Sequence, residues 1–236
     1  VGAFFFVNDS KDMDEFQDNL HAWYITKTGL ADILKKYGFT VDEILPKNSS
    51  FKRLEQDLPQ MCADRIDYNI RGAIWDDLIT PDQARQIIKD LEFTDGTWYF
   101  TTQESARLLA SASLDMTVGI WGSAENFVTG QWLATALKRA AHLGIITKED
   151  VYFSTDTAVW EKMLNSGDTE ILKQLHKITH SCEYFELNET IYDELIKGKF
   201  RGLNPLVKID QHYQHLLDID QEYVEKYTST KEIILA

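Results

Sequence analysis

The sequence predicts a mainly α-helical protein with a small C-terminal α+β part. The chain has 236 residues, of which 44% are hydrophobic, so it can bury a substantial core without disulfide bonds. It contains only 12 glycines and 4 prolines, which disfavours a turn-rich all-β fold. Apolar residues recur at three- and four-residue spacing up to about residue 180, as in helices packed on a core.

Most of the helical part can be divided into elements by its periodicity and its capping patterns. The helix with the clearest start has Asp57 and Gln60 in capping-box positions and Pro59 in its first turn. Thr147 and Asp150 repeat the capping pattern further along the chain. We expect helices over residues 12–26, 30–37, 41–45, 58–78, 80–91, 101–121, 125–143, 157–165 and 169–180.

Extended segments are predicted at two places. Residues 91–93 and 97–100 form two short β-like runs around the turn Thr94-Asp95-Gly96. The pattern changes again after residue 181. There we expect a strand over 182–187, a helix over 189–197, an extended stretch over 199–209, a helix over 219–227 and a terminal strand over 232–235. These patterns predict a helical domain over 1–180 and a small α+β subdomain over 181–236.

Charge and composition narrow the classes of partner. The chain carries 24 basic and 38 acidic residues, a net charge of −14, which argues against wrapping nucleic acid but allows a locally basic pocket for a small anion. The most apolar run, residues 1–7, is too short to cross a membrane and lacks the basic start of a signal peptide. Because the chain has only two cysteines, we expect a cytoplasmic protein. Because the most apolar run is too short to cross a membrane, we expect no membrane partner.

The segment from Cys62 to Arg71 concentrates the groups that bind phosphoesters. On a helix, Asp64, Tyr68 and Arg71 share a face, and Arg65 lies beside them. Aspartate is a hard oxygen ligand for a divalent cation, arginine binds phosphate through paired hydrogen bonds, and tyrosine can stack on a base or sugar. The alternative is an exposed ladder of ion pairs, Asp64–Arg71 and Asp67–Arg71.

The run from Ala63 to Arg71 resembles the last metal motif of the HD-domain phosphohydrolases. The resemblance implies an HD-domain-like helical bundle. The run is most similar to the branch related to deoxynucleoside triphosphate triphosphohydrolases, where the pattern is Asp-Lys/Arg-x-Asp-Tyr-x-x-Arg-Asp. The resemblance implies that Asp64 is a metal ligand and that Arg65 and Tyr68 contact substrate phosphate and sugar. Arg71 matches the motif arginine, while the family's next aspartate is Gly72. The likeness extends to residues 16–39, 126–146 and 199–205.

The family's other metal ligands, a histidine and a His-Asp dipeptide, have no counterpart in the sequence. Val1-Gly2-Ala3 resembles the residues that follow the first metal histidine, and the His-Asp segment would fall where Val7 meets Asn8. We therefore expect segments to be missing before Val1 and near residues 7–8. The alternative is a degenerate member of the family that binds no metal.

Other polar and aromatic residues are weaker candidates. Gln17 and His21 lie one turn apart, where family members often carry a polar pair near the metal. We expect two further histidine pairs, His176 with His180 and His212 with His215, to be surface residues. We expect Trp121, Trp132 and Trp160 to be core residues, and Cys62 to be buried and inert.

The sequence therefore predicts a metal-dependent phosphohydrolase that acts on a nucleotide or similar phosphoester. A divalent ion (manganese, magnesium, iron or zinc) would bind Asp64, while Arg65, Tyr68 and Arg71 would bind substrate. A non-catalytic nucleotide-binding regulatory or assembly subunit is the alternative, and a purely structural helical module is a third interpretation. A homo-oligomer is possible under each of them.

Overall fold

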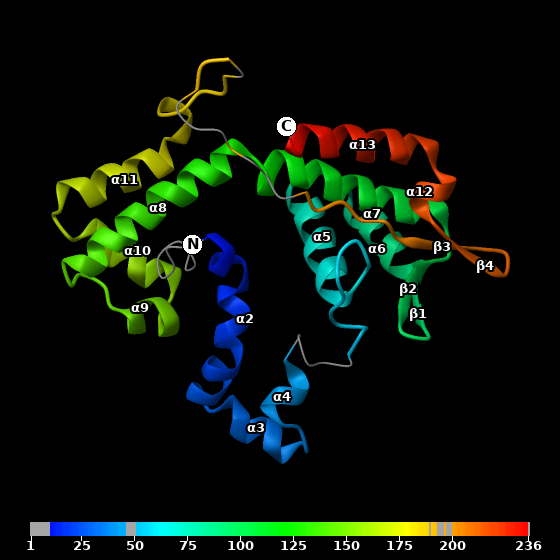
Figure 1. The fold of residues 1–236 in the computed structure, drawn as a ribbon, viewed down its shortest axis with the longest axis horizontal. Helices are drawn as coiled ribbons and strands as arrows, with labels where there is room; N and C mark the ends of the chain where they lie inside the picture. Colours follow the sequence, from blue (N-terminus) through cyan, green and yellow to red (C-terminus); the bar gives the residue numbers. More distant parts are fainter. Residues whose placement is uncertain (1–9, 46–50, 189, 193–195, 197–199, 236) are drawn as a thin grey trace. The chain divides into compact units, whose positions relative to one another are not determined.

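The computed structural model describes residues 10–45, 51–188, 190–192, 196 and 200–235 (Figure 1). The chain is mainly helical with one small four-stranded sheet, which confirms the predicted fold class. It divides into two compact units, one formed by residues 1–41 and 124–196 and the other by 42–123 and 197–236. Each unit therefore combines two separate stretches of chain, whereas the sequence patterns divide the chain once, near residue 180. Among the described helices, none has both the length and the apolar composition that crossing a bilayer requires.

The first unit is entirely helical in its described part. Helices α8 and α11 pack along each other, and seven buried residues contributed by α8, α10, α11 and the residues between them form its core. Aromatic side chains join α2 to α9, since Trp23 meets Tyr152 edge-on at 5.3 Å and Tyr24 stacks on Phe153 at 5.6 Å. The helices are α2 (Ser10–Lys27), α3 (Leu30–Lys36), α8 (Ala124–His142), α9 (Lys148–Phe153), α10 (Asp156–Leu164) and α11 (Thr169–Thr179), followed by the 3-10 turn η2 (Ser181–Glu183).

The second unit packs helices against one face of the sheet. Phe100 and Val207 are buried beneath α7, together with side chains from α5, α6 and α13. Its elements are α4 (Val41–Ile44), α5 (Ala63–Trp75), α6 (Pro81–Lys89), β1 (Leu91–Thr94), β2 (Thr97–Phe100), α7 (Gln103–Met116), the π-helical turn η1 (Thr117–Trp121), β3 (Leu206–Ile209), β4 (His212–His215), α12 (Leu216–Ile219) and α13 (Gln221–Leu235).

The sheet joins two stretches of chain that are far apart in sequence. Strands β1 and β2 form the predicted hairpin, whose turn holds Asp95 and Gly96 at φ of 52° and 81°. Strand β2 then pairs in parallel with β3, and β3 pairs antiparallel with β4. The strand order β1-β2-β3-β4 places the C-terminal segment directly beside the first hairpin.

The start of α5 differs from the prediction. The helix begins at Ala63, not near residue 58, and residues 51–62 form an irregular loop. Backbone carbonyls of this loop accept the first N–H groups of the helix, from Ala63 to Arg53 at 2.9 Å and from Asp64 to Leu54 at 3.4 Å. These contacts replace the predicted side-chain cap, because a helix start needs acceptors and the loop supplies them.

The C-terminal part also corrects two predictions. Residues 182–187 form no strand, since the 3-10 turn is followed by irregular chain. The expected strand over 232–235 is the last turn of α13, which buries Tyr223, Thr230 and Ile234 at helical spacing. Strand β4 and helix α12 were not predicted. The helix expected over 189–197 falls largely outside the described residues.

Close packing fixes the extended segment before β3. A side chain at Gly202 would meet the rings of Phe200 and Tyr227 at 2.4 Å. The two rings contact each other edge-on at 4.9 Å, and both pack against the core of the unit. One residue further on, the buried Tyr223 hydroxyl donates to the Leu203 carbonyl at 2.6 Å. The segment is thus held on α13 by shape and by a buried hydrogen bond.

A charged cap organises α11 in the first unit. The Arg139 guanidinium donates to both carboxylate oxygens of Asp168, at 2.6 and 2.8 Å. Asp168 also caps α11 by accepting from the backbone N–H of Ile171 at 3.0 Å. The Arg139 hydrogen bonds and this backbone N–H lower the pKa of Asp168 to about 2.

We expect Gly202→Ala to lower the free energy of unfolding by about 1–3 kcal/mol, because the two rings cannot both accommodate a methyl group. Urea unfolding measures the change. Gly130→Ala is the matched control: it lies inside α8 with open space around it, so alanine should leave stability unchanged or raise it slightly. Equal effects of the two substitutions would contradict this packing argument.

We expect Asp168→Ala to lower the melting temperature by about 2–4 °C more than Asp168→Asn does, since asparagine keeps the cap. The melting temperature of the wild type should exceed that of the asparagine variant above about pH 4, where the carboxylate is ionised in both folded and unfolded chains. Because the folded pKa is the lower one, this advantage should disappear as the pH falls from about 4 towards 2. Melting curves across this range measure it, and a pH-independent difference would contradict it.

Candidate functional site

Helix α5 presents the predicted carboxylate and phenol on neighbouring turns. Asp64 lies in the first turn and is exposed, while Tyr68 is half-buried one turn later. The Tyr68 ring rests edge-on against Trp121 of η1, with ring centroids 5.5 Å apart. Burial raises the pKa of the Tyr68 phenol, although the positive charges of Arg65 and Arg201 oppose the rise. The phenol is therefore a neutral hydrogen-bonding group near charges of both signs.

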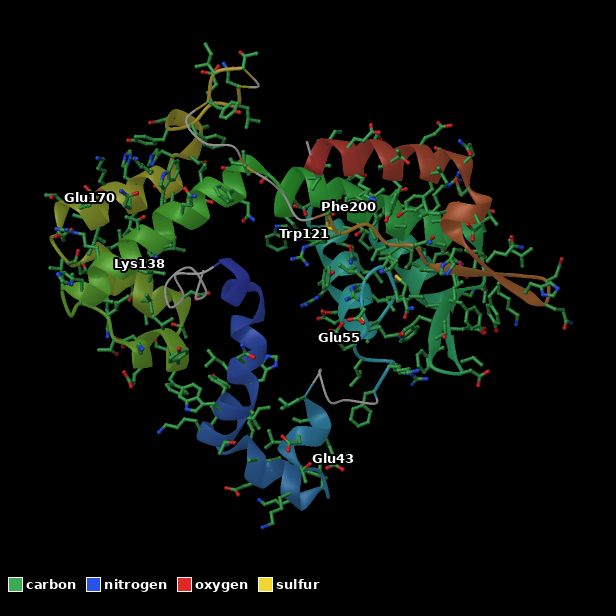
Figure 2. The ribbon with its side chains drawn as sticks, in the orientation of Figure 1. Glu43, Glu55, Trp121, Lys138, Glu170 and Phe200 are labelled. Carbon is green, nitrogen blue, oxygen red and sulfur yellow. The ribbon has the colours of Figure 1, made fainter. Side chains whose placement is uncertain are left out.

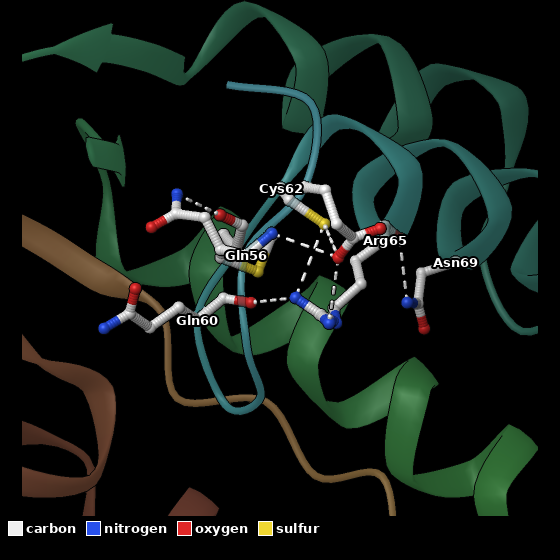
Figure 3. Close-up of polar contacts among 7 residues, drawn as sticks. Gln56, Gln60, Cys62, Arg65 and Asn69 are labelled. Carbon is white, nitrogen blue, oxygen red and sulfur yellow. Dashed lines mark hydrogen bonds and ion pairs between the residues drawn. The ribbon is translucent and has the colours of Figure 1, made fainter. Parts of the chain in front are cut away.

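Arg65 turns towards the loop of residues 51–62 (Figure 3). Its Nη1 donates to the Gln60 carbonyl at 2.8 Å and to the Cys62 sulfur at 3.4 Å, and its Nη2 pairs with Glu55 at 3.3 Å. Only 12% of the Arg65 side chain is exposed. The guanidinium thus fastens the loop to the helix that carries Asp64.

The loop is also fastened on its other side. The Trp98 indole N–H donates to the Arg53 carbonyl at 2.9 Å, and the Arg53 guanidinium lies 4.5 Å from the centre of the Phe93 ring. These contacts connect the loop to the β1–β2 hairpin. The start of α5 is consequently held in place by the rest of the second unit.

Cys62 is buried, as the sequence predicts. Burial raises the pKa of its thiol, an effect that the nearby Arg65 charge reduces without cancelling. The thiol therefore stays protonated at neutral pH and is a poor nucleophile.

Arg71 forms the surface ion pair that was the alternative prediction. Its guanidinium lies 2.8 Å from Asp67, one helical turn earlier, and the two side chains are 74% and 61% exposed. Such a pair stabilises a helix only slightly and can be broken at little cost. The pair Asp64–Arg71 does not occur among the ion pairs of the described residues.

The structure explains why Gly72 stands where the family motif has an aspartate. A Cβ atom there would lie 2.8 Å from the sulfur of Met116, because α5 and α7 pack closely at this point. The helix pair leaves little room for a carboxylate without displacing Met116.

The sequence patterns missed two polar residues beside this motif. Arg201 belongs to the C-terminal segment and acts electrostatically on Tyr68, about 130 residues away in sequence. Asn69 is completely buried; its amide donates to the Arg65 carbonyl at 2.8 Å, and its Oδ1 has no hydrogen-bond partner among the described residues. The likeness over residues 199–205 gave Arg201 no role, and Asn69 looks like an ordinary helix residue in the sequence.

A complete metal centre is not formed by the residues that the structure describes. Within those ranges, no three histidine, cysteine, aspartate or glutamate residues are grouped so that they could hold an ion. Asp64 supplies a single carboxylate, whereas zinc and magnesium sites use about four to six ligands, water included. The donor set at Asp64 is therefore insufficient on its own to bind a metal ion tightly.

The other candidate residues do not come together in one site, or their side chains lie outside the described part of the structure. His21 is half-buried on α2, and the Gln17 side chain is outside the described part. The rings of His176 and His180 stack in parallel at 4.1 Å, so their in-plane nitrogens do not converge on one ion. His212 and His215 are exposed on β4.

The three candidate tryptophans, Trp121, Trp132 and Trp160, are partly buried rather than fully enclosed. Trp121 packs on the core of the second unit and Trp160 on that of the first. Trp132 instead meets Tyr184 edge-on at 6.3 Å, with the Lys177 ammonium 5.3 Å from its ring.

We expect Arg65→Ala to lower the free energy of unfolding by about 1.5–3 kcal/mol, since it removes charged hydrogen bonds and leaves the Gln60 carbonyl unpaired. Arg71→Ala on the same helix should change it by less than about 0.5 kcal/mol, because its ion pair is exposed. Urea unfolding of both variants measures the contrast. A cost as large for Arg71→Ala as for Arg65→Ala would show that Arg65 does not fasten the loop.

Comparison with known proteins gives two relatives, and no family model matches the chain. The chain is 27% identical over 200 residues to the Uncharacterized protein YdhJ of Bacillus subtilis, an alignment that covers 85% of this chain and 61% of that protein. It is 19% identical over 166 residues to the Metal-dependent phosphohydrolase cns2 of Cordyceps militaris, covering 66% of this chain and 47% of that protein. The chain thus spans about three fifths and about half the length of these relatives, and it is distantly similar to a metal-dependent phosphohydrolase.

Proposed function

We propose that the chain is part of a metal-dependent phosphohydrolase of the HD superfamily that acts on a nucleotide or a similar phosphoester. One observation carries the proposal: the run from Asp64 to Arg71 lies on the core-packed helix α5, with the carboxylate exposed and Tyr68 half-buried one turn away. The distant similarity to the phosphohydrolase of Cordyceps militaris supports the same class of chemistry.

The residues of α5 have distinct roles in this proposal. The exposed Asp64 carboxylate is a ligand for a divalent ion (manganese, magnesium, iron or zinc), and further ligands come from outside the described residues. Tyr68 contacts sugar or base with its open edge, since its other side rests on Trp121. Arg65 keeps the start of the helix in position, and Arg71 is available to an anion once its weak pair with Asp67 opens.

A non-catalytic nucleotide-binding regulatory or assembly subunit is the second candidate. The observation that favours it is that, among the described residues, Asp64 belongs to no group of three or more histidine, cysteine, aspartate or glutamate residues that could hold an ion. This candidate predicts binding of a nucleotide without metal and without turnover.

We expect the full-length protein to release phosphate, triphosphate or nucleoside from a nucleotide panel when a divalent metal is added. Asp64→Asn should lower kcat/KM at least about 100-fold and reduce the metal content, because it replaces a charged ligand by a neutral one. Asp82→Asn is the matched control, since Asp82 is an exposed aspartate in the first turn of α6 and should leave both readouts unchanged.

Three results would decide between the candidates. Full activity in Asp64→Asn would refute the role of this carboxylate. Nucleotide binding that raises the melting temperature, without bound metal and without turnover, would favour the regulatory subunit. Absence of metal, of nucleotide binding and of turnover would refute both.

A further inference from the structure

The sheet of the second unit has an open edge at β4. The strand order β1-β2-β3-β4 gives β4 a neighbour on one side only, and its four residues are all exposed. Figure 2, in the orientation of Figure 1, shows the hairpin of β3 and β4 at one end of the second unit. An edge strand presents a row of backbone N–H and C=O groups to which another strand can be added.

The backbone of β4 faces β3 at every second residue. Directly after the strand, the Leu216 N–H donates to the Pro205 carbonyl, in the stretch that leads into β3, at 2.9 Å. Because the two sides of an antiparallel strand alternate, the other even-numbered residues of β4 also turn their backbone groups towards β3. The backbone groups of Tyr213 and His215 therefore face away from the sheet, on the side where the described chain supplies no strand.

The two edges of the sheet differ in charge. Strand β1 carries Glu92, and a charged side chain is a common protection of a sheet edge against further pairing. Strand β4 reads His-Tyr-Gln-His and contains no aspartate, glutamate, lysine or arginine, in a chain of which 26% is charged. Repulsion between acidic or basic side chains therefore does not keep a second β4 away.

Contacts within the unit hold β4 in its extended shape. The Tyr213 ring meets the buried Tyr99 edge-on at 4.8 Å. At the end of the strand, Nδ1 of His215 donates to the Asn204 carbonyl at 3.0 Å, and the Leu217 N–H donates to the Asn204 side chain at 3.1 Å. A strand that is already ordered loses little conformational entropy when it pairs.

We propose that β4 pairs antiparallel with β4 of a second copy of this chain, so that β1–β4 of both copies form one continuous sheet. The uncharged sequence of β4 favours this occupant, because a charged strand of another protein would find no ion-pair partner on it. A contact of about five residues per copy is much smaller than a standard interface, so we expect a Kd of about 10–100 µM. The dimer does not depend on the proposed function, since β4 lies outside the α5 motif.

The direction of the backbone groups selects the register of the pairing. Residues that face outward must lie opposite outward-facing residues of the second copy. A pairing centred on Tyr213 fulfils this condition and also brings His215 opposite Gln211 of the second copy. The two Tyr213 side chains then lie directly opposite each other and continue the aromatic contact with Tyr99, while His212 lies opposite Gln214.

Sedimentation of the full-length protein over a range of concentrations tests the dimer. Tyr213→Glu should raise the Kd at least about 10-fold, because it places two carboxylates opposite each other and removes the aromatic pair. Tyr192→Glu is the matched control: it makes the same change at an exposed tyrosine outside the sheet, and should dimerise like the wild type. Added salt should strengthen the dimer, since it screens the repulsion between two chains of net charge −14.

Disulfide cross-linking tests the register, whatever the glutamate does to folding. The background is Cys182→Ser, which removes the exposed cysteine. Tyr213→Cys should form a covalent dimer on mild oxidation, because directly opposite hydrogen-bonded residues have Cα atoms about 5.5 Å apart, a distance that suits a disulfide. Gln214→Cys should cross-link far less, since the two copies of residue 214 are then offset by two residues and more than about 7 Å apart.

Three results would overturn the proposal. The first is a protein that stays monomeric up to about 500 µM, well above the expected Kd. The second is a Tyr213→Glu variant that dimerises as well as the wild type, or a Tyr192→Glu variant that loses the dimer equally. The third is cross-linking at Gln214→Cys that equals that at Tyr213→Cys, or no cross-linking at either position.

Discussion

The second unit depends on the parallel pairing of β2 with β3. Tyr99 and Phe100 pair with Leu206 and Val207, and this contact joins the C-terminal segment to a hairpin more than 100 residues earlier. The pairing buries Phe100 and Val207 beneath α7. It also brings the chain before β3 alongside the start of α5, because the same segment binds the loop at Pro59. The same segment therefore contributes both to the core and to the surroundings of α5.

The two arginines of α5 differ in how much each contributes to stability. A guanidinium that is largely buried and satisfied by backbone and carboxylate acceptors, as at Arg65, contributes to stability and costs a great deal to detach. An exposed pair, as at Arg71, contributes little. The difference follows from burial and from the number of acceptors, because both residues carry the same charged group.

The Asp64 carboxylate could hold a metal ion tightly only together with other ligands. One exposed aspartate binds a divalent ion weakly, since affinity grows with the number of charged and correctly spaced donors. Under the proposed function, the motif on α5 supplies one of the metal ligands and some of the groups that contact substrate. The similarity to a metal-dependent phosphohydrolase covers about half of that relative's length.

The sequence by itself determined the helical class, the β1–β2 hairpin, the capping box at Thr147 and the chemically rich run on α5. All of these depend on local spacing, which a chain carries in its own residues. Only the tertiary structure decided that α5 starts at Ala63, because loop carbonyls and not a side chain accept its first N–H groups. It also decided that Arg65 supports the loop, that the last turn of α13 is helical and that the segment before β3 is bound to the loop at Pro59. Each of these depends on contacts between residues distant in sequence, and no local pattern encodes them.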